Sequence, residues 1–238
     1  MVSRADAARL AASQAGVRVL VERDLDVLWA RIWSRIPSGP TQAENVRDAF
    51  LASLPTLVER YGEMAAATAA DWYEAQREIA GVSGAFRVTL QASPYMDAID
   101  GTVRRTAGAL WTPKPEDMLA SLRPAVDKYV LAAGRQTITR AADADPKASG
   151  WARVGSGSSC RFCLMLIGRG AVYREKTVHF AAHKACNCAA VPSWDPNAPE
   201  VEVDLYQASR RTSSMSPKQR DKHNALIRDA LDRYVPVD

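Results

Sequence analysis

All four cysteines and two of the three histidines of this chain lie in one short window of its C-terminal half. The window contains Cys160-Arg-Phe-Cys163, then an intervening segment, then His183-Lys-Ala-Cys186-Asn-Cys188. A Cys-x-x-Cys turn can direct two thiolates at one ion while nearby backbone N–H groups donate to the sulfurs. The second cluster can supply the remaining ligands of a tetrahedral site. The spacing therefore predicts bound zinc.

More candidate ligands are present than a tetrahedral ion needs. His183 and Cys186 are three residues apart and can share one face of a helix or turn, whereas His179 is the least favoured candidate. The preferred set is Cys160, Cys163, His183 and one of Cys186 or Cys188. Two disulfides, which a cytosolic setting disfavours, and unbound thiols are the alternatives.

The expected zinc is structural. Catalytic zinc keeps an open coordination position and usually lies beside a carboxylate base, but Glu175 is the single acidic residue between Trp151 and Cys188. Four protein ligands close a site to chemistry. We therefore expect no catalytic residues, no small-molecule substrate and no enzymatic activity.

The same window is basic, although the whole chain carries a formal net charge of only +4. Its basic residues are Arg153, Arg161, Arg169, Arg174, Lys176 and Lys184. Such a cluster can face the phosphates of a nucleic acid, and Phe162, Tyr173 and Phe180 could offer stacking faces. Alternatively, the basic residues are solvated charges on the surface, and the aromatic residues form the core of a small module.

The elements that position this window are predicted to be helical. Apolar residues recur every three or four positions from Val17 to Ile36, which predicts a helix that the following Pro37 stops. Thr41 with Glu44 resembles a capping box and opens a second apolar run through Trp72. Pro55, inside that run, predicts a kink or a break.

The rest of the chain is predicted from shorter signals. Alternation over Phe86–Leu90 suggests a short strand, and a helix is expected over Met96–Leu110. The period of Leu119 to Ala133 predicts another helix, which contains Pro124 and ends before Pro146. Val201–Leu205 alternates as a strand would. Ser216-Pro217 is typical of the start of a final helix.

Composition bounds the fold class. The 238 residues are 47% hydrophobic and 24% charged, which is typical of a folded protein, and no apolar run approaches the roughly 18 residues of a membrane span. The N-terminus lacks the apolar segment of a secretory signal. We expect a mostly α fold: a helical body (1–150), a small zinc-stapled α+β module (151–194), and a linker with a C-terminal helical tail (195–238).

Several motifs together resemble a known family. They are Trp151-Ala-Arg-Val154, Cys160-Arg-Phe-Cys-Leu-Met165, Arg169-Gly-Ala-Val-Tyr173, His183-x-x-Cys-x-Cys188, Asp71-Trp-Tyr-Glu74 with Arg77, and Gly134-Arg-Gln-Thr-Ile138. As a set they are similar to the phage Mu F-like minor head proteins of phages that infect actinobacteria. The resemblance covers the chain from about Thr41 to Trp194.

The resemblance implies a head-morphogenesis protein of the virion. Such a protein is assembled in the host cytoplasm and lies inside the capsid, where portal protein and/or major capsid protein and the packaged double-stranded DNA are its partners; no membrane is involved. Some members of the family are labelled capsid maturation proteases, which is the enzymatic alternative. Against it, Gly155-Ser-Gly-Ser-Ser159 is typical of a flexible turn and lacks the strand-to-helix context of a nucleophile. A zinc-stabilised DNA-binding protein is the other alternative.

Overall fold

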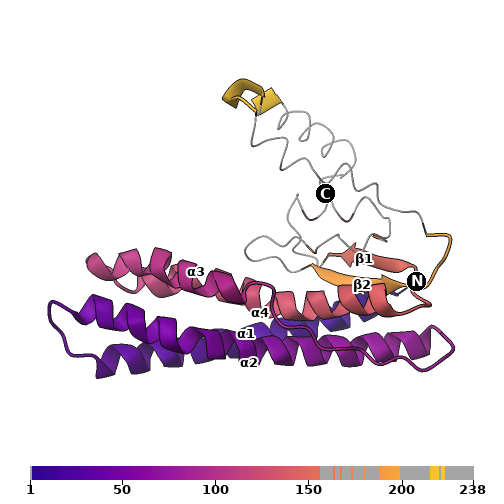
Figure 1. Ribbon diagram of the computed structural model, residues 1–238, viewed down its shortest axis with the longest axis horizontal. Coiled ribbons are helices and arrows are strands. Elements are labelled where there is room, and N and C mark those ends of the chain that lie inside the picture. The colour runs from indigo at the N-terminus through magenta and orange to yellow at the C-terminus, as the bar shows by residue number, and fades with distance from the viewer. Residues whose placement is uncertain are drawn as a thin grey trace.

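The structure is a computed structural model that describes residues 2–155, 188–198, 215–219 and 221–222, together with positions 163, 167, 173 and 180. Long helices lie side by side as a bundle, and a small sheet covers one end of it (Figure 1). The prediction of a mostly α fold is confirmed. None of the helices in these ranges is long and apolar enough to span a bilayer.

Helix α1 spans Arg4–Arg35 and begins well before Val17, where the sequence predicts its apolar stripe to start. Ser3 caps the helix, since its Oγ accepts from the backbone N–H of Asp6 at 3.1 Å. The buried stripe extends back to Leu10, which is 3% exposed. The first turns of α1 therefore pack on the rest of the molecule as well.

Helix α2 spans Gln42–Ile79 and runs through a proline. Its predicted start at Thr41 is confirmed, but the predicted capping box does not form, because the Thr41 side chain makes no capping hydrogen bond. The sequence predicts a kink or a break at Pro55, and no break occurs. Leu54 and Val58 are both fully buried. Their packing compensates for the hydrogen bond that the proline ring removes.

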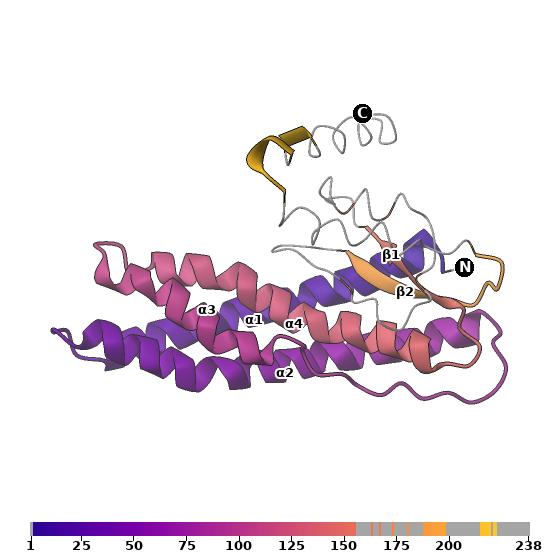
Figure 2. The same cartoon turned by 45° about the horizontal axis from the view of Figure 1, so that its top comes forward.

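The connection after α2 is not a strand. Residues 82–94 form an irregular segment that returns along the bundle (Figure 2), so the prediction of a strand over Phe86–Leu90 is wrong. Side chains of the helices, not a neighbouring strand, hold its backbone. The helix predicted over Met96–Leu110 is confirmed as three pieces. They are the 3₁₀ helix η1 (Met96–Ala98), α3 (Ile99–Thr106) and the 3₁₀ helix η2 (Ala107–Trp111).

Helix α4 spans Asp117–Ala144 and contacts α1, α2, α3 and both strands. It continues through Pro124, and its predicted end before Pro146 is confirmed. It approaches α2 closely at Gly134, where an added Cβ would lie 2.8 Å from the carbonyl oxygen of Ala65. The absence of a side chain at this position lets the two backbones come together.

Strand β1, Gly150–Val154, pairs antiparallel with β2, Ala189–Ser193, and every residue of one strand has a partner in the other. Both pack on α4, and β2 also contacts α1 (Figures 1 and 2). On the other edge of β1, Tyr173 exchanges both backbone hydrogen bonds with Trp151, at N···O distances of 2.7 and 3.1 Å. Residue 173 therefore pairs with β1 on the side that faces away from β2.

Two hydrophobic cores hold the molecule together. The larger fills the bundle, where Phe50 and Leu122 are fully buried. The second lies where α1, α2 and α4 meet the strands, and there Tyr73 and Ile138 belong to the same cluster as Trp151. The chain thus changes from helix to strand at residue 150, but one hydrophobic core contains residues from both sides of this boundary.

The C-terminal part is described over a short helical stretch. Residues 217–219 and 221–222 are helical, which confirms the start predicted at Ser216-Pro217. The backbone N–H of Ser216 donates to Gln219 Oε1 at 2.9 Å, and the backbone N–H of Gln219 donates to Ser216 Oγ at 3.4 Å. This pair forms a capping box. The strand predicted over Val201–Leu205 lies outside the described residues.

The close approach of α2 and α4 can be tested at Gly134. We expect Gly134→Ala to lower the free energy of unfolding by about 1–3 kcal/mol, measured by urea denaturation, because the new methyl group would press on a backbone oxygen. Gly101→Ala on α3 is the matched control. Its Cβ would meet open space, so stability should rise by about 0.5–1 kcal/mol. A similar gain at both sites would contradict a tight crossing.

Candidate functional site

A buried ion pair lies where the helical bundle meets the strands. Arg77 Nε donates to Asp145 Oδ2 at 2.9 Å, and the two side chains are 8% and 0% exposed. The same oxygen accepts from Tyr73 Oη at 3.2 Å and from Trp194 Nε1 at 3.1 Å. The other oxygen accepts from the backbone N–H of Lys147 at 3.0 Å. Asp145 thereby joins α2, the end of α4 and the chain after β2.

Opposing effects set the ionisation of this junction. Burial raises the pKa of Asp145, but hydrogen bonds from Arg77, the Lys147 backbone and Trp194 outweigh burial and hold that pKa below its ordinary value. Burial and the nearby charge of Asp145 raise the pKa of Tyr73, so its hydroxyl stays protonated and donates. The junction is therefore a charged network whose hydrogen bonds are satisfied.

The far end of the Arg77 guanidinium holds the turn that follows α2. It donates to the carbonyl oxygens of Val82 and Ser83, each at 3.2 Å, and to that of Gly84. Gly84 has a φ of 88°, which a residue with a side chain rarely adopts. The guanidinium also lies 5.6 Å from the ring centroid of Phe86. One arginine thus fixes both the ion pair and the turn.

Neighbouring motif residues fasten the segment after the turn. Glu74 accepts from the backbone N–H of Val88 at 2.9 Å and pairs with Arg87. The hydrogen bond from Val88 is the main reason that the pKa of Glu74 is lowered. On α4, Thr137 Oγ1 accepts from the backbone N–H of Gln91 at 3.1 Å. These contacts take the place of strand pairing over residues 86–91.

Four residues of the motif at 71–77, namely Trp72, Tyr73, Glu74 and Arg77, are therefore architectural. Trp72 Nε1 donates to the carbonyl oxygen of Asp6 at 3.1 Å and fastens the first turns of α1. Tyr73 and Arg77 reach the end of α4, and Glu74 holds the loop. Four neighbouring side chains of one helix each secure another part of the chain.

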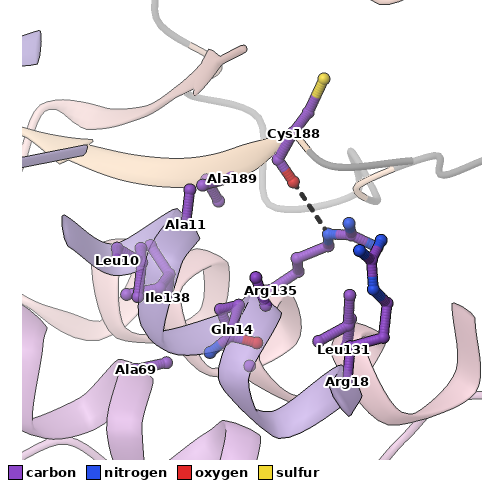
Figure 3. Close-up of a pocket in the computed structure, with 13 residues that line it drawn as sticks. Leu10, Ala11, Gln14, Arg18, Ala69, Leu131, Arg135, Ile138, Cys188 and Ala189 are labelled. Atoms are coloured by element: carbon purple, nitrogen blue, oxygen red, sulfur yellow. Dashed lines mark hydrogen bonds between the residues drawn. The ribbon is translucent and has the colours of Figure 1, made fainter. Parts of the chain in front are cut away.

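A small cavity of about 30 Å³ lies among α1, α2, α4 and β2 (Figure 3). Leu10 and Ile138 contribute to its mainly apolar wall. At one end, Arg135 Nε donates to the carbonyl oxygen of Cys188 at 3.0 Å, and Arg18 extends toward the same end. A volume of this size suits a water molecule and is too small for a substrate.

Two of the predicted zinc ligands lie in one buried cluster. Cys163 and Cys188 are 1% and 2% exposed and share the second core with Trp151, Tyr173 and Phe180. Trp151 and Tyr173 stack with ring centroids 4.4 Å apart. The Cys188 sulfur points away from the cavity, while its carbonyl oxygen faces Arg135 (Figure 3). The helical body therefore helps to position this cysteine.

The other predicted site residues lie outside the described residues. They are Cys160, His183 and Cys186 among the zinc ligands, His179, and Arg161, Arg169, Arg174, Lys176 and Lys184 in the basic window. Within the part of the chain that the structure describes, no group of three or more His, Cys, Asp or Glu residues could hold a metal ion. The complete zinc site stays a prediction.

Arg153, the sixth residue of the basic window, lies in the core. The sequence places it on a phosphate-facing surface, but the side chain is buried, with 5% of the residue exposed. Its guanidinium lies 3.8 Å from the ring centroid of Phe180, and that of Arg135 lies 5.2 Å from the same ring. The guanidinium charge is attracted to the face of the ring, so Arg153 packs as part of the core.

A buried carboxyl between α1 and α4 is a feature that sequence reasoning missed. Asp127 is 8% exposed and faces Glu22 across the two helices. Burial, then the charge of Glu22 and a hydrogen bond with it, raise the pKa of Asp127 to about 7, against the opposite effect of Arg18 and Arg123. The available signal was its place in the apolar period of α4, three and four residues before buried Val130 and Leu131.

The fold and these contacts define a mostly helical protein whose motif residues join α2 and α4 to a small sheet. The family model described as VG15 protein matches residues 1–213, and the chain belongs to this family. The match implies a phage-encoded protein. No curated protein and no solved structure matches the chain.

The Asp145 junction predicts a large effect of Arg77→Met. The substitution leaves a carboxylate buried without its cation, so we expect the free energy of unfolding to fall by about 3–5 kcal/mol in urea denaturation. Arg87→Met is the control, because the Arg87 side chain pairs with Glu74 while 90% exposed, and we expect little change there. Equal losses in both variants would contradict the special role of the junction.

The raised pKa of Asp127 predicts a pH dependence. Folding takes up a proton between the ordinary value of 3.8 and about 7, so this group lowers stability as pH rises through that window, and its effect is constant above it. Asp127→Asn should remove a slope of up to about 1.4 kcal/mol per pH unit from urea unfolding measured at several pH values. Asp100→Asn, at an exposed site on α3, is the control. An unchanged slope in Asp127→Asn would contradict the assignment.

Proposed function

We propose that this chain is a phage minor head protein that acts in head assembly inside the capsid, near the portal. The observation that carries the proposal is the VG15 match over residues 1–213, which fits the similarity of its motifs to the Mu F-like minor head proteins. Portal protein and/or major capsid protein are the proposed partners. The role is one of assembly, without catalysis.

The shape of the body supports this role. Helices of 32 and 38 residues are about 48 and 57 Å long, and with α4 they form an elongated bundle (Figure 1). Buried polar contacts and a tight helix crossing fix its geometry, so it can present long faces to neighbouring proteins without rearrangement. A rigid spacer of this kind suits a component that must keep its form among larger subunits.

Structural zinc is part of the proposal. Cys160, Cys163, His183 and one of Cys186 or Cys188 would hold the ion, which would tie these segments together. The buried cluster that contains Cys163 and Cys188 supports this set, since two of the candidate ligands belong to the same small core. The hydrogen bond from Arg135 that fixes the Cys188 backbone favours Cys188 as the fourth ligand.

Contact with packaged DNA would fall to the other basic residues of the window, since Arg153 belongs to the core. The alternative of a capsid maturation protease makes a separate demand: incubation with this chain must shorten the major capsid protein. The assembly role expects a capsid protein of unchanged length on a gel. Cleavage that requires this chain would replace the proposal with the enzymatic alternative.

Localisation in the particle tests the proposal. We expect the chain in purified DNA-filled heads, in few copies, with density at the portal vertex inside the capsid when heads with and without it are compared by electron cryomicroscopy. The same purified protein, prepared under reducing conditions, should carry about one zinc per chain by elemental analysis. Absence from heads would overturn the assembly role, and absence of zinc would remove the metal while leaving that role in place.

A further inference from the structure

Helix α2 has an acidic outer surface. It contains seven acidic and three basic residues. Arg77 forms the buried ion pair with Asp145, and Arg47 forms an ion pair with its neighbour Asp48. The remaining exposed charges are Glu59, Arg60, Glu63, Asp71 and Glu78. The outward face of α2 is therefore acidic, whereas the window between Trp151 and Cys188 is basic.

An open groove of about 730 Å³ runs beside this acidic face, between α2 and residues 90–96. Its apolar surface includes Met64 and Leu90, which are 39% and 50% exposed, and Met96. Glu59, Arg60 and Glu63 line it from α2, and the two carboxylates are one helical turn apart. The groove thus combines exposed large apolar side chains with two carboxylates and one guanidinium, so its lining carries a net negative charge.

Side-chain contacts fix the walls of the groove. The backbone of the 90–96 wall is held by Thr137 through Gln91, and Lys128 Nζ lies 4.3 Å from the ring centroid of Tyr95 in the same wall. The other wall is part of α2, and the inner face of this helix is buried against α4. A preformed groove binds a partner at a smaller cost in ordering than a mobile one.

These features select the class of partner. Two carboxylates repel the phosphates of DNA, and a second copy using the same patch would place the same acidic residues against one another. The α2 lining residues 59–67 extend over about 12 Å, or two turns of a helix. An amphipathic helix fills such a groove with residues at i, i+3 or i+4, and i+7, and basic residues beside that stripe would meet the carboxylates.

We propose that the groove beside α2, lined by Glu59, Glu63, Met64 and Leu90, binds a basic amphipathic helix of a partner protein. This gives the proposed assembly role a contact surface. The inference rests on that role for the origin of the partner and on the groove alone for its chemistry. The basic window and the acidic groove would then serve different partners.

A helical peptide probe tests the groove with the full-length chain. The probe is a fluorescently labelled peptide of about 18 residues, with Leu along one stripe and Lys on both sides of it. We expect saturable binding by fluorescence anisotropy. A peptide of the same composition in scrambled order, and one with Glu in place of Lys, should bind at least ten-fold more weakly. Equal binding of the scrambled peptide would overturn the proposal.

Matched charge reversals locate the binding. Glu59→Lys with Glu63→Lys should weaken binding at least ten-fold, whereas Asp71→Lys with Glu78→Lys changes the same charge on the same helix outside the groove and should have little effect. Leu90→Ser, an exposed change in the other wall, provides a second variant that spares α2. Equal loss in both double variants would overturn the groove as the site.

The sources of failure can be separated. If the chain sediments as a dimer that Glu59→Lys with Glu63→Lys dissociates, the occupant is a second copy and the proposed partner is wrong. If the peptide binds at the groove but the chain is absent from heads, the groove stands and the assembly role falls. If the chain is in heads but does not bind the peptide, the assembly role stands and the groove is not the binding site.

Discussion

The carboxylate of Asp145 is the constraint on which the arrangement of this molecule depends. It lies just after α4 and just before β1, and its donors come from α2, from its own turn and from the residue after β2. A charge this buried is tolerated only when its lone pairs are occupied, since removal from water costs several kcal/mol. The end of the bundle, the turn after α2 and the sheet are consequently placed together.

Two of the motifs that carry the family resemblance act inside the fold. The motif at 71–77 secures the N-terminal turns, the end of α4 and the connecting loop, and the motif at 134–138 supplies a close helix crossing, a hydrogen bond to Cys188 and a hydrogen bond to the loop. Both motifs therefore preserve the geometry of the body. The proposed binding groove beside α2 is lined by residues outside both motifs.

Periodicity predicted the long helices because their inner faces are apolar over many turns, but it failed where side-chain contacts decide. The loop over Phe86–Leu90 has a strand-like alternation, yet Glu74 and Thr137 occupy its backbone. The start of α1 is rich in alanine and gives little contrast between faces. The sequence places Arg153 at a surface because charged residues usually lie there, whereas its guanidinium packs against the Phe180 ring in the core. Of the predicted zinc ligands, Cys163 and Cys188 share one cluster, and the others lie outside the described residues.

The pairing of β1 with β2 has a consequence for chain length. Val154 lies opposite Ala189, so the two ends of the segment between the strands are held side by side. Three described residues of that segment, Cys163, Tyr173 and Phe180, are buried in the second core together with Tyr73 and Ile138 of the helices. A change in the number of residues between the strands is therefore tolerated only where these three side chains keep their places, because their displacement would leave a cavity in that core.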